Sequence, residues 1–455
     1  MPIISINPTT GDAIQAYDDM TPDQTTSAIQ DAADAWRDWR ATSFAERAEL
    51  LRATAGMLRE RKAELARLMA LEMGKPLKQG VAEAEKCAWV CEYYAEHGEH
   101  QLAPDVVLTD ARRSYVAFQP LGVVLAVMPW NFPLWQVYRF AAPALMAGNA
   151  GLLKHASNVP GCALVIEEIF RRAGAPDGLF RTLLVGSAQV KSVIEHPLVR
   201  AVTLTGSTPA GRAVASQAGA VLKKTVLELG GSDPYLVLDD ADLEQAVTTC
   251  VNSRLINSGQ SCIAAKRFIV TRPVLSEFTE RFVALMRTRR MGDPLDSSSD
   301  LGPQARADLR DGLHRQVMRS VERGARLALG GEVPDGPGAF YPPSVLTDVT
   351  PGMPAFDEEL FGPVAAIAAA DDEADAIRLA NHSVFGLGAA VFTRDTDRGE
   401  RVALALDAGA TFVNGLVASD PRLPFGGIKE SGYGRELGSY GIREFVNIKT
   451  VHVSA

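Results

Sequence analysis

The chain has 455 residues, of which 47% are hydrophobic, and it carries a formal net charge of −9. A chain of this length exceeds what a single hydrophobic core organises, so two large domains are expected. The acidic balance disfavours a nucleic-acid surface, and the longest apolar run, residues 121–129, is too short to span a membrane. We expect neither nucleic acid nor a membrane as a partner.

Cysteine usage and the amino terminus both predict a cytoplasmic protein. The five cysteines are scattered and odd in number, which is typical of a reducing compartment rather than of a disulfide framework. The first residues lack the positively charged segment and apolar core of a secretory signal.

The first hundred residues are predicted to be mostly helical. Thr21 with Gln24 and Ser43 with Glu46 form capping boxes, the first of them with a proline at the first helical position. The second helix is expected to run to about residue 73, before a glycine, and a third to cover about 78–94.

A metal site is a weak alternative in this region. Cys87, Cys91, His97 and His100 have a spacing that loosely resembles a zinc pattern. However, the two cysteines lie one turn apart on a helix that also carries Trp89, as on a packed face, and no Cys-x-x-Cys is present. No metal is predicted.

From residue 114 the pattern changes to short apolar runs that alternate with helices. Strands are predicted at 114–118, 123–127, 152–154, 183–185, 201–205, 225–229 and 236–238, with helices at 159–173 and 209–218. A second alternating series comprises 267–270, 275–287, 307–323, 363–368, 374–381, 389–392 and 411–414, and residues 445–453 form a terminal strand. Such alternation indicates doubly wound parallel sheets, which bind ligands at the carboxyl ends of their strands.

Residues 257–262 form a small, polar turn that ends in Cys262. A thiol exposed there among backbone N–H groups tends to ionise, and the thiolate is the nucleophilic form. The alternative is a small buried hydrophobe, the usual role of a free cysteine. The turn alone does not decide between them.

Three further stretches favour catalysis. Glu228 ends an apolar strand, where desolvation should raise its pKa toward that of a general base. Asn131 presents an amide donor in a turn between two prolines, and the turn at Gly206 leaves a strand and opens a helix, as a phosphate-binding turn does. Each also has a structural interpretation, as an ion-pair partner, a turn residue or an ordinary connection, and the Gly206 turn lacks G-x-G-x-x-G.

The combination of these motifs closely resembles the aldehyde dehydrogenase superfamily over nearly the whole chain. The matching stretches are 129–133, the strand end at Lys154, 206–211, 228–231, 259–262, 358–363, 424–427 and 431–436. Within the superfamily, residues 154–158, 228–234 and 418–420 resemble the bacterial NAD(P)-dependent succinate-semialdehyde dehydrogenases.

The resemblance implies an α/β fold with two doubly wound, Rossmann-like domains and a small bridging β-sheet for oligomerisation. Residues 1–101 and 121–230 would form the cofactor-binding domain and residues 231–430 the catalytic domain. Residues 102–120 and 431–455 would bridge subunits, which implies a homodimer or homotetramer.

The resemblance also implies the chemistry. Cys262 would attack the aldehyde carbon, and the Asn131 side chain and the Cys262 N–H would hold the oxyanion. A nicotinamide cofactor would accept the hydride, and Glu228 would activate the water that releases the acid.

The implied cofactor is NAD or NADP. Ser157 stands where strictly NAD-dependent relatives carry a glutamate that repels a 2′-phosphate, so NADP should also be used. The positions that match cofactor-binding residues are Trp130, Asn131, Lys154, Ser157, Gly206, Ser207, Thr208, Leu229, Glu359 and Phe361.

The implied substrate is a short aldehyde with a distal carboxylate, with succinate semialdehyde as the first choice. Arg139 matches a carboxylate-binding arginine on the helix after the asparagine turn, and Ser419 matches a hydroxyl residue at the pocket mouth. Ile256 replaces a second expected arginine, and Arg254 is the nearest substitute. The alternative for Arg139 is an ion pair at a surface or between domains, because an unpaired charge is costly to bury.

Other functions remain open at this point. The enzyme could oxidise other small semialdehydes or aliphatic aldehydes, or acylate CoA, although Glu228 favours hydrolysis. A cysteine hydrolase or acyltransferase would need a base near Cys262, usually a histidine. A binding or structural protein with this fold would have no need of Cys262, Glu228 and Asn131 together.

Overall fold

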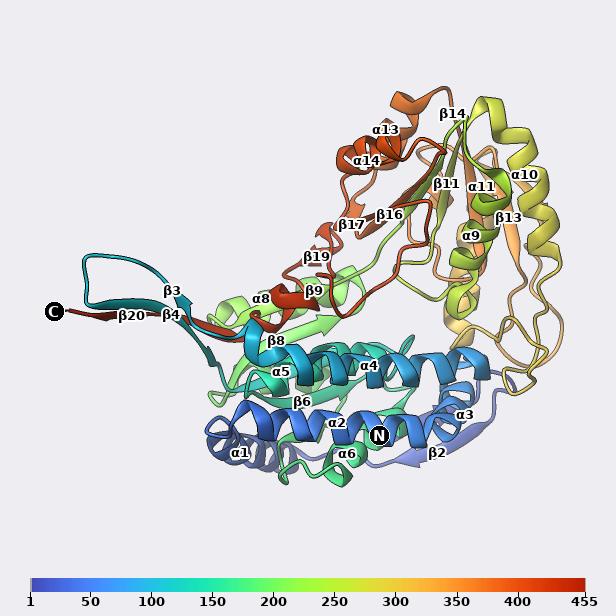
Figure 1. Cartoon of the computed structure of the whole chain (residues 1–455). Helices are drawn as coiled ribbons and strands as arrows, with labels where there is room; N and C mark the ends of the chain where they lie inside the picture. The colour runs from blue at the N-terminus through green and yellow to red at the C-terminus, as the bar shows by residue number, and fades with distance from the viewer. Residues whose placement is uncertain (1, 455) are drawn as a thin grey trace.

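The computed structural model describes residues 2–454, which form two lobes and a projecting β-ribbon (Figure 1). The first lobe contains a sheet in the order β19-β9-β8-β5-β6-β7, in which β19 pairs antiparallel to β9 and the other neighbours are parallel. Its strands are Val123–Met128 (β5), Ala150–His155 (β6), Phe180–Thr182 (β7), Val199–Thr205 (β8), Lys224–Glu228 (β9) and Gly432–Tyr433 (β19).

Helices cover this sheet in layers. The wholly buried α5 packs on β5 and β6, and α2 and α4 lie against α5. Both predicted capping boxes, at Thr21 and Ser43, are confirmed. The helices are Pro22–Trp39 (α1), Phe44–Glu60 (α2), Lys62–Met73 (α3), Leu77–Gln101 (α4), Trp135–Met146 (α5), Pro160–Arg172 (α6), Val190–Glu195 (α7) and Thr208–Ala220 (α8), with a 3₁₀ turn at Ser187–Gln189 (η1).

Several element boundaries differ from the sequence prediction. The second helix breaks at Arg61, so that α2 and α3 are separate, before Gly74 ends α3 in a left-handed conformation with φ 78°. The predicted strand at 183–185 is wrong, since β7 ends at Thr182. Leu183 and Val185 are buried in the loop that follows, which gave this segment its strand-like pattern. The hairpin of Ile3–Ile6 (β1) and Ala13–Tyr17 (β2) was not predicted.

The second lobe is built on a sheet in the order β12-β13-β14-β11-β10-β16-β17, in which β12 pairs antiparallel to β13. Its strands are Pro234–Val237 (β10), Arg267–Thr271 (β11), Arg326–Leu329 (β12), Ser344–Thr347 (β13), Val364–Ala370 (β14), Gly388–Phe392 (β16) and Ala410–Val413 (β17). Alternate residues of its strands enter different cores: Leu236 and Ile269 face one, and Tyr235 and Phe268 face the other.

These two cores place helices on both faces of the second sheet, which confirms a doubly wound arrangement. Residues of α9 and α10 join the core of one face, and those of α11 to α14 join the other. The helices are Leu243–Leu255 (α9), Arg272–Arg287 (α10), Ala307–Glu322 (α11), Pro354–Asp357 (α12), Glu373–Asn381 (α13) and Thr396–Ala405 (α14). No helix within residues 2–454 is long and apolar enough to cross a membrane.

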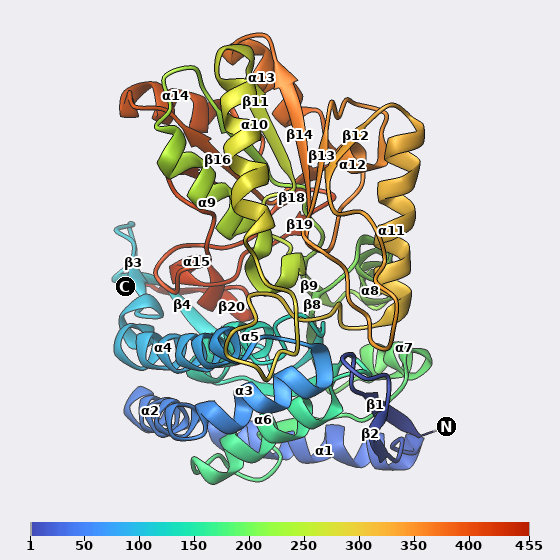
Figure 2. The same ribbon diagram turned by 90° about the vertical axis from the view of Figure 1, so that its right-hand side faces the viewer.

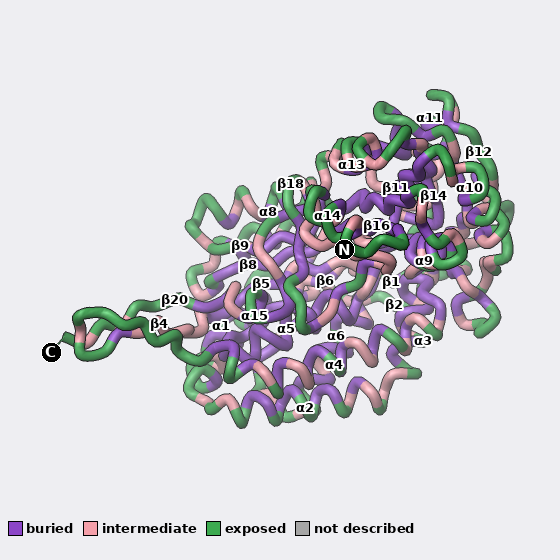
Figure 3. Tube along the Cα trace, turned by 45° about the horizontal axis from the view of Figure 1, so that its top comes forward, coloured by how far each residue is buried: buried purple, intermediate pink, exposed green. Residues whose placement is uncertain are grey.

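The projecting ribbon consists of Asp105–Val106 (β3), Arg113–Pro120 (β4) and Val446–Val453 (β20), in the order β20-β4-β3. β20 pairs antiparallel with β4 over its whole length, from Val446 opposite Pro120 to Val453 opposite Arg113. Much of the ribbon is exposed (Figure 3). The remaining elements, near the lobe junction, are Phe385–Gly386 (β15), Ile428–Lys429 (β18) and Gly438–Ile442 (α15).

At the junction of the two lobes (Figure 2), the carboxyl ends of the first sheet's strands face the amino ends of the second sheet's strands. The carboxyl ends of β5, β6, β8 and β9 lead into the segments that carry Asn131, Ser157, Ser207 and Leu229. The segments that enter β10, β11 and β14 carry Gly230, Cys262 and Glu359. The predicted site residues therefore gather at the carboxyl edge of the first sheet, where doubly wound folds bind ligands.

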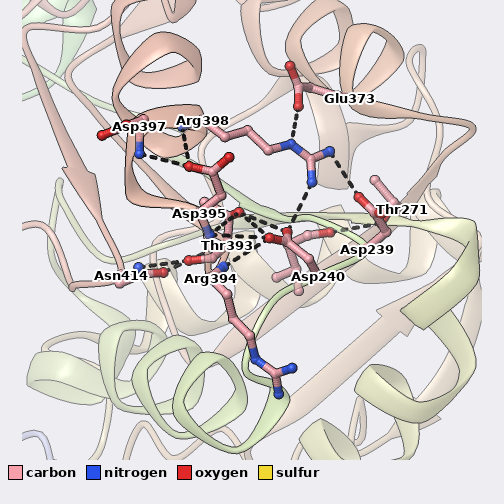
Figure 4. A network of polar contacts seen from close by, with 11 residues as sticks. Asp239, Asp240, Thr271, Glu373, Thr393, Arg394, Asp395, Asp397, Arg398 and Asn414 are labelled. Carbon is pink, nitrogen blue, oxygen red and sulfur yellow. Dashed lines mark hydrogen bonds and ion pairs between the residues drawn. The ribbon is translucent and has the colours of Figure 1, made fainter.

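The carboxyl edge of the second sheet is filled by the protein itself. Arg398 forms ion pairs with Asp239, Asp240 and Glu373 there, and Thr393 Oγ1 donates to Asp240 at 2.8 Å (Figure 4). These contacts lower the pKa of Asp240 despite the opposing effect of burial. This edge is thus a closed ionic network rather than an open binding edge.

Candidate active site

The backbone before Cys262 is coiled in the left-handed region. In the short helix Ile256–Gly259 (η2), φ is 54° at both Asn257 and Ser258 and 76° at Gly259. A Cβ on Gly259 would lie 2.2 Å from the Gly362 carbonyl carbon, so only glycine fits. Two non-glycine residues in this conformation store strain that the surrounding contacts must hold.

Contacts from several segments hold this loop. Gln79 Oε1 accepts from the Asn257 N–H at 2.7 Å, and Asn257 Nδ2 donates to the Asn131 carbonyl at 2.7 Å. Ser258 Oγ accepts from the Gly302 N–H at 3.0 Å. The loop of the predicted nucleophile is therefore tied directly to the turn of the predicted oxyanion donor.

Arg254 belongs to this scaffold rather than to the substrate pocket. It is fully buried, and its Nη2 donates to the Gly259 carbonyl at 2.7 Å and its Nη1 to that of Val364 at 3.4 Å. Burial lowers its pKa to about 9. This geometry corrects the expectation that Arg254 contacts substrate: its donors point at backbone oxygens that fix the loop.

The Cys262 thiol is less acidic than its sequence context predicts. Although the residue is only half-buried, the surrounding protein removes the thiol from bulk water and raises its pKa to about 12. Lys266 and Arg139 act in the opposite direction. Lys266 Nζ donates to the Cys262 carbonyl at 2.6 Å, which places a positive charge behind the nucleophile. At rest the group is a thiol, and substrate or cofactor must alter its surroundings to activate it.

Asn131 lies beside the nucleophile loop. Its Nδ2 donates to the Gln260 carbonyl at 3.0 Å, and the side chain is buried. An amide nitrogen carries two N–H groups, so one remains for an oxyanion. Glu83 on α4 supports this turn, because its Oε1 accepts from the N–H groups of Leu134 and Trp135, both at 2.9 Å.

Glu228 ends β9 with 2% of its surface exposed. Burial raises the pKa of this carboxyl well above 4.5, and the Arg139 charge only partly opposes the effect. Among the described residues neither of its oxygens has a hydrogen-bond partner, and it lines neither cavity beside Cys262. The structure thus supplies the predicted basicity but does not bring the carboxyl to the sulfur, so the side chain must turn to meet a water there.

A cavity of about 380 Å³ opens on one side of Cys262. Arg139 and Ser419 both line it, as expected for substrate residues. The Arg139 guanidinium, however, already forms an ion pair with Glu436 and lies 4.5 Å from the centre of the Phe425 ring. The lining also includes Lys86, Phe132, Trp135, Gln136, Ser261, Ile263 and Val417.

A second cavity, of about 250 Å³, is also lined by Cys262. Trp130 and Phe361 meet edge to face at its wall, with ring centres 5.7 Å apart. Glu359 accepts from the Gly231 N–H at 3.1 Å. Seven of the predicted cofactor residues line this cavity: Trp130, Asn131, Gly206, Ser207, Leu229, Glu359 and Phe361.

The other three predicted cofactor residues lie at adjoining strand and helix ends. Thr208 begins α8, whose first turn has no side-chain cap, so its N–H groups are available to a pyrophosphate. Lys154 and the exposed Ser157 lie at the end of β6. Burial lowers the pKa of Lys154, and within residues 2–454 it has no acidic partner. These residues fit a dinucleotide that carries a 2′-phosphate.

Sequence reasoning missed residues that act through distant contacts. Lys86 forms a hydrogen bond with Ser419, which lies 333 residues later in the sequence. Glu83, on the neighbouring α4, caps the start of α5. Lys266 lies only four residues after Cys262, but a lone lysine entering a strand carries no functional signal. Glu83 also gave no functional signal, because a glutamate near a lysine such as Lys86 on a predicted helix is an ordinary pattern of an exposed helix face.

Comparison with known proteins identifies the class. Residues 2–451 match the aldehyde dehydrogenase family, so the chain belongs to that family and is an oxidoreductase that acts on aldehydes. It is 50% identical, over 100% of both chains, to a Synechocystis protein described as a probable succinate-semialdehyde dehydrogenase using NADP(+).

Two further relatives agree with this placement. The chain is 51% identical to an Escherichia coli succinate semialdehyde dehydrogenase that uses NAD(P)+, covering 98% of this chain and 97% of the relative. A succinic semialdehyde dehydrogenase from Streptococcus pyogenes, solved with NADP+, is 37% identical with a TM-score of 0.97, covering 99% of this chain and 100% of that one.

Proposed function

We propose that this protein oxidises succinate semialdehyde to succinate, with NADP and also NAD as the hydride acceptor. One observation carries the proposal: Cys262 lines both cavities, so the same residue can meet an aldehyde in the first and a dinucleotide in the second. The names of the relatives support the choice of substrate and cofactor.

Cys262, Asn131 and Glu228 would each carry out a different part of the reaction. After the Cys262 thiol has released its proton to water, Sγ adds to the aldehyde carbon, and the carbonyl electron pair moves to oxygen, where Asn131 Nδ2 and the Cys262 N–H stabilise it. Trp130, Glu359 and Phe361 would hold the nicotinamide dinucleotide, which would supply the acceptor for the hydride that leaves the aldehyde carbon. Cys262 then holds the acyl group as a thioester. Glu228, once it has turned toward the cavity and lost its own proton to water, removes a proton from the attacking water, and the acid leaves as the sulfur regains its electrons.

The use of NADP is supported by two positions. Lys154 offers a cation without an acidic partner among residues 2–454, and Ser157 is a small hydroxyl rather than a carboxylate that would repel a phosphate. Neither feature excludes NAD, whose ribose hydroxyls can also bond to these groups.

The cavity chemistry favours an acidic aldehyde over a neutral one. Arg139 lies in its wall, Ser419 is at its edge, and the Lys86 ammonium lies beside that serine. A broader aliphatic-aldehyde specificity is the second candidate, supported by the apolar rings of Phe132, Trp135 and Phe425 in the same wall. A hydrolase of the Cys-His type is less favoured, because no histidine of the described chain lines either cavity.

We also propose that identical subunits associate and that the protein is cytoplasmic. β20 is the outer strand of the ribbon, and Ile448 on it is 64% exposed. An edge strand of this kind pairs readily with another chain. All five cysteines are free thiols, as expected in a reducing compartment.

The proposal is tested by measuring kcat/KM for succinate semialdehyde and butanal, each with NADP and with NAD. We expect the acid to be preferred over its neutral counterpart and NADP to support turnover. Equal kcat/KM values for the two aldehydes would move the assignment to the broader specificity. Absence of turnover with NADP would contradict the cofactor proposal.

A further inference from the structure

Lys266 contacts both the loop that carries Cys262 and a wall of the second cavity. It is fully buried, and its Nζ donates to the Ser261 carbonyl at 2.8 Å and to the Cys262 carbonyl at 2.6 Å. The same nitrogen lies 3.4 Å from Oε1 of Glu359, which lines the second cavity. An ammonium has three N–H groups, so these three oxygens use its whole donor capacity. One side chain thus joins the predicted nucleophile to a predicted cofactor residue.

The backbone of Lys266 is fixed on both sides, which determines where its side chain begins. Its N–H donates to the Asp233 carbonyl at 3.1 Å, just before β10, and its carbonyl accepts from the Ala366 N–H of β14 at 3.0 Å. Lys266 itself directly precedes β11, the strand between these two. The ammonium is therefore held by the core of the second sheet rather than by an exposed loop.

Glu359 is held at one carboxylate oxygen and free at the other. Its Oε1 accepts from the Gly231 N–H at 3.1 Å and meets Lys266. Among residues 2–454, its Oε2 accepts no hydrogen bond, and a Cβ on Gly230 would lie 2.5 Å from it. The carboxylate therefore rests on two glycines with one oxygen left for a ligand. A side chain that is 20% exposed needs such contacts to keep a single rotamer.

We propose that Lys266 is a positioning residue for the oxidation: its ammonium holds Glu359 so that the free oxygen meets the dinucleotide, and it holds the Cys262 loop through the same atom. The cofactor residue and the nucleophile are thereby kept in a constant relative position, which hydride transfer requires. Lys266 itself lines neither cavity, so it acts only through these two groups. This inference rests on the proposed function for the identity of the dinucleotide.

Asp233 is the alternative acidic partner of Lys266, and its contacts argue against that role. Its Oδ1 accepts from the Gly388 N–H at 3.1 Å, and among the described residues its Oδ2 has no hydrogen-bond partner. No ion pair joins it to Lys266 within residues 2–454. Burial raises the pKa of Asp233 to about 7, although the Lys266 charge opposes this rise. Glu359 is therefore the acid that Lys266 contacts, and Asp233 acts on the lysine only from a distance.

Lys266 and Glu359 have opposite effects on the Cys262 thiol. Burial raises the pKa of the thiol to about 12, and Lys266 and Arg139 oppose this rise. Glu359 and Asp233 add to it. Removing the lysine charge should therefore lower the fraction of thiolate, and removing the Glu359 charge should raise it. A loop that was merely loosened would change in the same way in both variants.

The first test measures the Kd for NADPH by fluorescence titration in wild type, Lys266→Met, Glu359→Gln and the double variant. We expect Lys266→Met to raise Kd about tenfold, because Glu359 loses its charge-assisted contact. The double variant should bind no more weakly than Glu359→Gln, since the lysine acts through that carboxylate. Asp233→Asn is the matched control, because it removes the other nearby acid and lines neither cavity. Its Kd should stay within about twofold of wild type.

The second test measures alkylation of Cys262 by iodoacetamide at about pH 8 without cofactor, followed on its peptide by mass spectrometry. We expect alkylation about tenfold slower in Lys266→Met and faster in Glu359→Gln, because the thiolate fraction of a thiol with a pKa well above the pH follows that pKa directly. Lys266→Gln keeps two N–H donors for the two loop carbonyls and loses the charge, so it should behave like Lys266→Met.

The outcomes separate this inference from the proposed function. If wild type does not bind NADPH, the cofactor assignment fails and this inference with it. If wild type binds NADPH and both lysine variants bind it equally well, the positioning role is overturned and the function stands. Additive losses in the double variant, or alkylation that changes in the same direction in Lys266→Met and Glu359→Gln, would also overturn it. If neither lysine variant folds, Glu359→Gln decides alone: faster alkylation supports the shared ammonium, and unchanged or slower alkylation contradicts it.

Discussion

Burial, more than residue type, sets the chemistry of single groups in this protein. It keeps the Cys262 thiol and the Glu228 carboxyl in their neutral forms and leaves Lys86 close to losing its proton. Replacing such a group with a neutral side chain of similar shape removes its titration, so the pH dependence of stability or activity reports its protonation state.

Glu228→Gln should be more stable than wild type at neutral pH. The native pKa of Glu228 lies above its ordinary value of 4.5, so the native state binds the extra proton. The stability from the neutral carboxyl is complete below about pH 4.5 and is lost as pH rises through the native pKa. Thermal unfolding at several pH values should show the Tm gap between variant and wild type closing in acid. A gap that did not depend on pH would contradict the buried, neutral state of this group.

Ser157→Glu should shift cofactor use from NADP to NAD. A carboxylate at the end of β6 would repel a 2′-phosphate and accept from the ribose hydroxyls of NAD. We expect kcat/KM with NADP to fall at least about tenfold, which corresponds to about 1.4 kcal/mol. Ser157→Ala is the neutral control and should keep NADP. Unchanged kcat/KM with NADP in the glutamate variant would place the phosphate elsewhere.

At the scale of elements, the junction of α4 and α5 links packing to catalysis. Glu83 forms a fully buried ion pair with Lys75 and caps the start of α5, directly after the Asn131 turn. Lys75 Nζ also lies 3.9 Å from the centre of the Phe132 ring within that turn. Asn131, the proposed oxyanion donor, thus lies in a turn that is held by a helix about fifty residues earlier in the chain.

Lys75→Met and Glu83→Leu should each cost about 3–5 kcal/mol in the free energy of unfolding, because each leaves one buried charge unpaired. The double variant should cost less than the sum of the two, since no buried charge remains. Urea unfolding of wild type, the two single variants and the double variant measures the coupling energy between Lys75 and Glu83. Strict additivity would show that the pair does not act as a unit.

The sequence predicted elements wherever the signal was local. The capping boxes at Thr21 and Ser43 and the glycine stop at Gly74 formed as expected, and the strand end that carries Glu228 lies where its motif indicated. The break at Arg61 has no proline or glycine to mark it. The roles of Arg254 and Lys86 depend on partners brought close only by folding, so no spacing pattern could have shown them.

At the scale of the whole molecule, the ribbon of β3, β4 and β20 is where we propose that subunits associate. It exposes apolar side chains, with Val106 75% and Ile448 64% exposed. Ile448→Asp should shift the protein to smaller species in sedimentation velocity, because a charge on an edge strand disfavours pairing with another chain. Leu404→Asp, at an 83% exposed position on α14, is the control and should leave the assembly unchanged. A wild type that sedimented as a monomer would contradict the proposed association.

The central claim is that oxidation passes through Cys262 at the meeting point of the two cavities. It is tested by following reduced cofactor formation from succinate semialdehyde and NADP in wild type and in Cys262→Ala, with NADP binding measured separately for both. We expect one reduced cofactor per aldehyde consumed in wild type. The alanine variant should show no detectable turnover and nearly unchanged NADP binding, because only the covalent step is lost. Turnover by Cys262→Ala at the wild-type rate would contradict the account.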